Sequence, residues 1–257
     1  VPIEETACPS HQITTGSKGE GRATVTLSPA DSIPNKDFVL RYRVAGERIK
    51  SNLLAQRDER GGFFTLMLFP PQDLRGLKRA PLELVFVLDC SGSMSGVPLA
   101  QAKAAVERGL RQLQPGDSFQ LINFSMDARQ LGARPLDATE ENVQRGLSYL
   151  EELRSEGGTM MIKGIKAALE FPHDPKRLRF VCFLTDGYIG NEAEILRAVA
   201  ERLGPARIFS FGVGSSPNRY LMDRMAKLGR GAVAYLSHKD NAGQVMDAFF
   251  ARISHPA

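Results

Sequence analysis

Two runs that are apolar at every position constrain the fold of this chain more than any other feature. They are residues 84–88 (LVFVL) and 180–184 (FVCFL). A strand with one face in water alternates apolar and polar side chains, whereas a strand of a parallel sheet covered on both faces is apolar throughout. The two runs therefore predict central strands of a parallel sheet.

The segments between and after these runs alternate between strand-like and helix-like patterns. Residues 98–113, for example, place Leu99, Ala102, Val106 and Leu110 at helical spacing. This alternation predicts an α/β fold with a doubly wound, mostly parallel six-stranded sheet and helices on both faces. The expected strands are 84–88, 118–124, 129–131, 180–184, 207–211 and 232–236, and the expected helices are 98–113, 139–154, 160–170, 192–203, 218–228 and 241–253.

The last expected helix has an apolar stripe with a spacing of three to four residues. We expect this stripe to pack on the sheet, because a one-sided apolar face on a helix marks its buried side. Lys239-Asp240-Asn241 offers capping residues at its start, and Pro256 lies just beyond its end. The stripe consists of Val245, Met246, Phe249, Phe250 and Ile253.

Residues 1–81 have a different pattern and predict a small all-β region. Strand-like runs occur at 23–27, 38–44 and 63–69, with a weaker one at 51–57, and Gly-, Pro-, Asp- and Asn-rich turns separate them. Three or four strands bury a face only if something covers it, so this region is expected to form part of a β-sandwich. We therefore expect two domains, residues 1–81 and residues 82–257.

Composition and charge argue against several classes of protein. The chain is 42% hydrophobic and 24% charged, which is ordinary for a globular protein. No apolar run approaches the roughly 18 residues that span a bilayer, so we expect no transmembrane segment. The sequence has no basic stripe with interleaved aromatic residues, so it does not predict nucleic-acid binding. The three cysteines and four histidines are too scattered for a disulfide framework or a zinc site.

Polar residues at the ends of the two apolar strands form a candidate metal site. Ligands of such sheets bind beyond the carboxyl ends of the strands, where Asp89, Ser91 and Ser93 follow one strand and Asp186 follows the other, with Thr159 just before a helix. Carboxylates and hydroxyls suit Mg²⁺, with Ca²⁺ or Mn²⁺ as alternatives. Two carboxylates leave such a cation under-neutralised. The pattern therefore predicts that an acidic residue of a protein partner completes the site.

Other interpretations of these residues are weaker. Strand-end caps and turn formers have the same residue types, and a lone D-x-S-x-S would carry little weight. Hydrolysis by Ser91 or Ser93 lacks a histidine near the three segments in the sequence and a G-x-S-x-G elbow. Phosphoryl transfer through Asp89 needs a second carboxylate two residues on, where Ser91 stands. We therefore predict a chain that is not an enzyme, with no catalytic residue and no cofactor besides the metal.

The same residues resemble the metal-ion-dependent adhesion site of von Willebrand factor type A domains. The motif D-x-S-x-S at 89–93, Thr159 and T-D-G at 185–187 match all five coordinating positions, and the resemblance covers residues 82–253. It implies that Ser91, Ser93 and Thr159 place hydroxyls on Mg²⁺, while Asp89 and Asp186 act directly or through waters. It also implies a metal-dependent adhesion module. The alternative is a structural or assembly domain whose partner binds away from the metal.

The upstream region resembles heavy chains of the inter-alpha-trypsin inhibitor and their bacterial surface relatives. The resemblance rests on Pro9-Ser10-His11, Phe38-Val39-Leu40-Arg41 and the strand at 63–71. It implies an extracellular or cell-surface location, with a bacterial outer surface or periplasm included. In those relatives another domain precedes this region and a β segment follows the last helix. We therefore expect this chain to be a fragment, with that segment beginning at 254–257.

Overall fold

The computed structural model describes residues 3, 5–17, 22–31, 36–43, 50–69 and 79–253. Contacts divide the chain into two units, one of residues 1–78 and the other of residues 79–256. Within the described residues, every buried hydrophobic side chain lies at Leu82 or later. The expected start of a β segment at 254–257 and the last two residues of the 63–71 strand lie outside the described residues.

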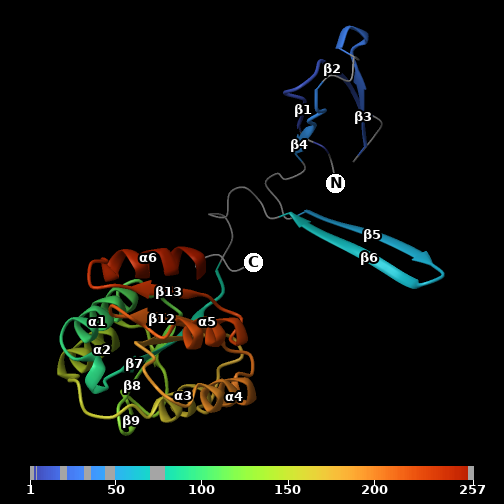
Figure 1. Ribbon diagram of the computed structural model, residues 1–257. Coiled ribbons are helices and arrows are strands. Elements are labelled where there is room, and N and C mark those ends of the chain that lie inside the picture. The colour runs from blue at the N-terminus through green and yellow to red at the C-terminus, as the bar shows by residue number, and fades with distance from the viewer. Residues whose placement is uncertain are drawn as a thin grey trace. The chain divides into compact units, whose positions relative to one another are not determined.

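The described part of the first unit consists of small antiparallel sheets of two strands each, with one short 3₁₀ turn at Pro29–Asp31 (Figure 1). This confirms the expected all-β character. Two of the strands, β1 and β2, were not expected, and in the described part of the expected strand at 38–44 only residues 41–43 form a strand. The pairs are β1 (Glu5–Ala7) with β4 (Arg41–Arg43), β2 (Ile13–Ser17) with β3 (Ala23–Leu27), and β5 (Lys50–Asp58) with β6 (Gly61–Phe69).

The second unit is built on a mostly parallel sheet, as expected. Within residues 79–253 the strand order is β10-β8-β7-β11-β12-β13, and β9 also pairs with β8. The sheet has seven strands rather than six because β9 and β10 pair antiparallel with successive parts of the same edge of β8. The strands are β7 (Leu82–Asp89), β8 (Ser118–Phe124), β9 (Ala128–Gln130), β10 (Leu136–Asp137), β11 (Leu178–Thr185), β12 (Arg207–Val213) and β13 (Val233–Leu236).

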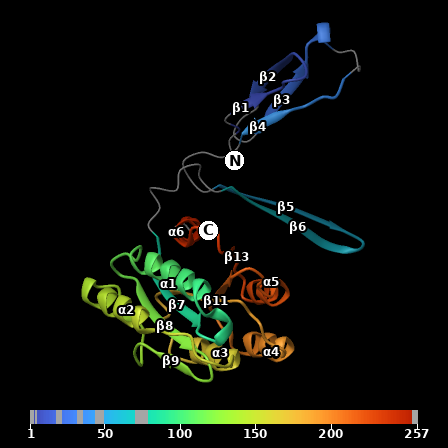
Figure 2. The ribbon, with the colours of Figure 1, turned by 60° about the vertical axis from the view of Figure 1, so that its left-hand side comes forward.

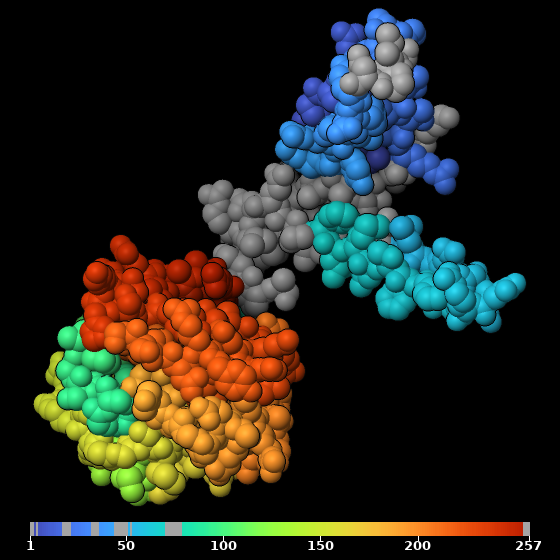
Figure 3. All heavy atoms as spheres, viewed as in Figure 1, coloured from blue at the N-terminus to red at the C-terminus, as the bar shows by residue number. Residues whose placement is uncertain are grey.

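Helices cover both faces of this sheet (Figure 2). Alternate residues of β7 divide between them: Leu84, Phe86 and Leu88 pack with α1, α2 and α6, whereas Val85 and Val87 pack with α3, α4 and α5. Side chains fill the space between the ribbons (Figure 3). The helices are α1 (Val97–Leu110), α2 (Glu140–Glu152), α3 (Met161–Leu169), α4 (Glu192–Arg202), α5 (Arg219–Leu228) and α6 (Ala242–Ile253).

Local signals account for several helix ends. Thr139 caps α2, since its hydroxyl accepts a hydrogen bond from the backbone N–H of Asn142 at 3.2 Å. The apolar stripe of α6 is confirmed: four of its five members are buried, and Val245 is half-buried against the same core. Within the described residues, no helix has the length and hydropathy that a membrane crossing requires.

The parallel strands β8, β7, β11 and β12 all end at one edge of the sheet. The register aligns Leu88 of β7 with Leu184 of β11, so the residues that follow these two strands emerge side by side. Helices α1 and α5 begin at this same edge, directly after the loops that follow β7 and β12. The expected site residues on β7 and β11 therefore meet here.

Candidate metal site

Asp89 is the most deeply placed of the five candidate residues. It is the last residue of β7 and is fully buried. Its Oδ1 accepts a hydrogen bond from the backbone N–H of Ser91 at 2.8 Å, and its Oδ2 accepts one from the Thr185 hydroxyl at 2.5 Å. The Thr185 hydroxyl oxygen in turn accepts the backbone N–H of Gly187 at 2.8 Å. The carboxylate is thus fixed from two neighbouring strands.

The charge of Asp89 is only partly compensated. Burial raises the pKa of the Asp89 carboxyl, and the nearby Asp186 carboxylate raises it further, while the hydrogen bonds from Thr185 and Ser91 act in the opposite direction. Within the described residues, neither carboxylate forms an ion pair with a basic side chain. A divalent cation would supply the positive charge that the protein does not, so the donor set fits a hard metal ion.

Two serine hydroxyls lie together in the loop after β7. Ser91 is buried and Ser93 is exposed, and their Oγ atoms are 3.1 Å apart. A 3₁₀ turn at Gly92–Met94 brings them together, because the backbone N–H of Met94 binds the carbonyl of Ser91 at 3.1 Å. The buried Met94 side chain anchors this turn in the core. Both hydroxyls can therefore face a common ligand.

The loop that carries Thr159 is fastened to the loop after β7. The Ser155 hydroxyl donates to the carbonyl of Ser91 at 2.7 Å, and the backbone N–H of Glu156 donates to the carbonyl of Cys90 at 2.7 Å. Gly158 has a positive φ of 86°, which favours glycine. Thr159 itself is half-buried, and no hydrogen bond joins it to the other four candidate residues, all of which the structure describes. The structure thus fastens the loop of Thr159 beside Ser91 through Ser155 and Glu156.

Asp186 lies half-buried at the mouth of the site. Its Oδ1 accepts the backbone N–H of Tyr188 at 3.1 Å, and its carbonyl accepts the backbone N–H of Asn218, the N-cap of α5, at 2.8 Å. Asp186 and Ser93 line an open cavity of about 440 Å³. The other residues that line it are Ser95, Pro98, Tyr188, Val213, Gly214, Ser215, Ser216 and His238.

Several residues that shape this site were not expected from the sequence. Thr185 was visible within T-D-G, but its role became clear only when the two strands were aligned. Ser155 precedes Thr159 by four residues in an irregular loop, so no periodic signal marks it. His238 lines the cavity although it lies far from the site in the sequence, but no hydrogen bond joins it to Ser91 or Ser93 within the described chain.

Cys90 follows Asp89 directly in the chain and is buried. Burial raises the pKa of the Cys90 thiol to about 12, so this residue, although adjacent to Asp89, is a packing group. Within the described residues, no three or more His, Cys, Asp or Glu side chains gather as a metal-holding cluster. The candidate site differs from such clusters because three of its five donors are hydroxyls.

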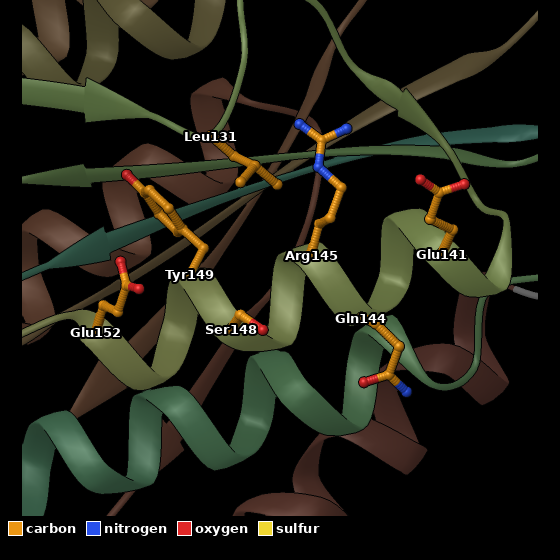
Figure 4. A pocket seen from close by; sticks show the side chains of 7 residues that line it. All are labelled: Leu131, Glu141, Gln144, Arg145, Ser148, Tyr149 and Glu152. Carbon is orange, nitrogen blue, oxygen red and sulfur yellow. The ribbon is translucent and has the colours of Figure 1, made fainter.

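A separate hollow of about 460 Å³ lies along α2 (Figure 4). It is lined by Leu131 and by one side of the helix, where Arg145 and Tyr149 point the same way. The Tyr149 hydroxyl donates to Oδ1 of the buried Asn123 at 2.5 Å. None of the five candidate residues lines this hollow, so it is a surface that a partner could use without touching the candidate metal site.

Comparison with known proteins identifies the family of the second unit. The model of the von Willebrand factor type A domain matches residues 82–235. Inter alpha-trypsin inhibitor, heavy chain 4, of Mus musculus is 32% identical over 89% of this chain. A von Willebrand factor A domain-containing protein of Dictyostelium discoideum is 28% identical over 90% of it. The chain spans about a quarter of the length of each of these two relatives.

Solved structures share the fold at low sequence identity. A von Willebrand factor type A structure from Catenulispora acidiphila has a TM-score of 0.61 at 20% identity, covering 82% of this chain and 46% of that one. Proximal thread matrix protein 1 from the mussel byssus, solved with a zinc-occupied metal-ion-dependent adhesion site, has a TM-score of 0.52 at 16% identity. That match covers 66% of this chain and 47% of the mussel protein.

Proposed function

Because this chain belongs to the von Willebrand factor type A family, we propose that it is a metal-dependent protein-binding module of a cell-surface or secreted protein. Asp89, Ser91, Ser93, Thr159 and Asp186 would hold one divalent cation, Mg²⁺ by preference. Domains of this family typically serve as protein-interaction or adhesion modules. The metal requirement and the location are the parts that this proposal adds.

The observation that carries the proposal is the only partly compensated charge of Asp89. A fully buried carboxylate that lies near a second carboxylate and has no basic partner among the described residues is costly in the folded protein. A bound cation would offset this cost, and the two serine hydroxyls beside Asp89 are suitable additional donors. The mussel protein, which shares the fold at 16% identity, holds zinc in a metal-ion-dependent adhesion site, the kind of site that Asp89, Ser91 and their neighbours resemble.

The chain's own residues would divide the work. Asp89 and Asp186 would provide negative charge, Ser91, Ser93 and Thr159 would provide neutral oxygen donors, and Thr185 would keep Asp89 in place through its 2.5 Å hydrogen bond. When bound, the cation supplies positive charge at the mouth of the cavity that Asp186 lines. Such a centre favours an acidic side chain of a partner protein.

Selection from a displayed random-peptide library tests this function. Peptides bound to the immobilised protein in Mg²⁺ should be released by EDTA and should share an Asp or Glu. Replacing that residue by Asn or Gln should abolish binding. Binding that persists in EDTA would overturn the proposal and favour the alternative, a structural or assembly domain whose partner binds elsewhere.

A further inference from the structure

A second cavity, of about 580 Å³, adjoins the one that holds Asp186. Tyr188 and Ser216 line both cavities and so form the wall between them. The remaining lining of the second cavity comes from the loop before α4, the first residue of α4 and the turn before α5: Ile189, Gly190, Glu192, Pro217 and Asn218. A partner that reaches Asp186 therefore passes next to this second cavity.

The second cavity contains one carboxylate, that of Glu192. Glu192 is half-buried in the first turn of α4, and its Oε1 accepts a hydrogen bond from Nδ2 of Asn218 at 3.1 Å. Within the described residues, no basic side chain forms an ion pair with it. Among the described side chains, only the neutral amide of Asn218 forms a hydrogen bond with this carboxylate.

Three of the side chains that line the cavity with Glu192 are largely apolar: Tyr188, Ile189 and Pro217. Tyr188 is 78% exposed, the most exposed large hydrophobic side chain within the described residues. Ile189 and Pro217 are half-buried beside it. An aromatic face attracts a cation, and apolar walls cover the methylene groups of a lysine or arginine stem. The combination of these three side chains and one carboxylate matches a long basic side chain.

We propose that this second cavity binds a lysine or arginine side chain of the same partner whose acidic side chain binds at the metal site. The inference rests on the proposed function and adds the chemistry of the partner: an acidic and a basic residue presented close together. A purely apolar side chain fits less well, because it would cover Glu192 without compensating its charge.

The peptides selected in Mg²⁺ provide the test. Lysine or arginine should be enriched near the shared acidic residue. Glu192→Gln keeps a hydrogen-bond acceptor for Asn218. It should lower the affinity for such a peptide by roughly fivefold, as expected from the loss of a partly exposed ion pair. The matched control is Glu194→Gln in the same helical turn, where the carboxylate contacts Asn191 outside the cavity; it should leave the affinity unchanged.

A charge exchange gives a second readout. Glu192→Lys should bind the selected peptide poorly and recover part of the affinity when the basic residue of the peptide is replaced by glutamate. Thermal unfolding should show that all three variants are folded.

The outcomes separate this proposal from the proposed function. EDTA-sensitive acidic peptides without basic residues, or equal affinities of wild type and Glu192→Gln, would overturn the basic subsite and leave the metal site standing. A selection that enriches no peptide, although calorimetry shows intact Mg²⁺ binding, would overturn the basic subsite as well. Peptides that stay bound in EDTA would overturn both the basic subsite and the proposed function.

Discussion

At the scale of residues, the candidate site depends on how Asp89 is held. The sequence identifies the carboxylates and hydroxyls because D-x-S-x-S and T-D-G follow the two apolar strands. It does not reveal that Thr185 bridges Asp89 and Gly187, because that contact requires the alignment of β11 beside β7. Thr185 is fully buried, so water cannot take over either of the hydrogen bonds that its hydroxyl makes.

Thr185→Val tests this bridge. Valine has the same shape but leaves a carboxylate oxygen of Asp89 and the N–H of Gly187 without a partner. We expect a loss of about 1–3 kcal/mol in the free energy of unfolding and a loss of roughly tenfold or more in Mg²⁺ affinity. Urea unfolding and calorimetry measure the two effects. Thr185→Ser, which keeps the hydroxyl, should retain both properties, and a valine variant as stable as wild type would refute the bridge.

At the scale of elements, the sequence predicts the long segments well and the short ones poorly. Strand β8 and helix α6 lie within one residue of their expected limits, because each has apolar residues spread along most of its length. Strand β10 was missed because two residues carry no periodicity. Strand β2 (ITTGS) was missed because only one of its residues is large and apolar. Tertiary pairing, which local sequence does not encode, decides such elements.

Phe249 of α6 tests the packing of the best-predicted helix. Its ring lies 4.9 Å from that of Phe209 and 5.5 Å from that of Phe211 (centroid to centroid), so it joins α6 to β12. Phe249→Ala should lower the free energy of unfolding by about 3–5 kcal/mol. Tyr220→Ala is the control, because Tyr220 is 59% exposed and should cost much less. Equal losses in the two variants would show that α6 does not contribute to the core as described.

At the scale of the whole molecule, the two units differ in what can stabilise them. The second unit has helices on both faces of its sheet, whereas the β5–β6 hairpin of the first exposes Leu53, Phe64, Leu66 and Leu68 on one face. A two-stranded hairpin is at best marginally stable in water without a cover. The expectation of a small β region was thus correct in strand type, while its assembly depends on contacts that the sequence pattern does not specify.

Expression of residues 79–257 alone tests this difference. This fragment should unfold in one cooperative transition and bind Mg²⁺ as the whole chain does, because the buried core and all five candidate residues lie within it. Residues 1–78 alone should lack a cooperative transition. Circular dichroism during heating, with calorimetry for the metal, gives both results. A fragment 79–257 that fails to fold would show that the first unit is required for the second.

Titration calorimetry of Mg²⁺ with Asp89→Asn tests the central claim most directly. Asparagine keeps the size of the side chain but removes a buried charge that lies near Asp186 and has no basic partner among the described residues. We predict that the variant loses at least about tenfold in Mg²⁺ affinity while the metal-free protein unfolds at the same or a higher temperature than wild type. Asp127→Asn, in an exposed residue paired with Lys163, should bind Mg²⁺ normally. Undiminished Mg²⁺ binding by Asp89→Asn would contradict the account.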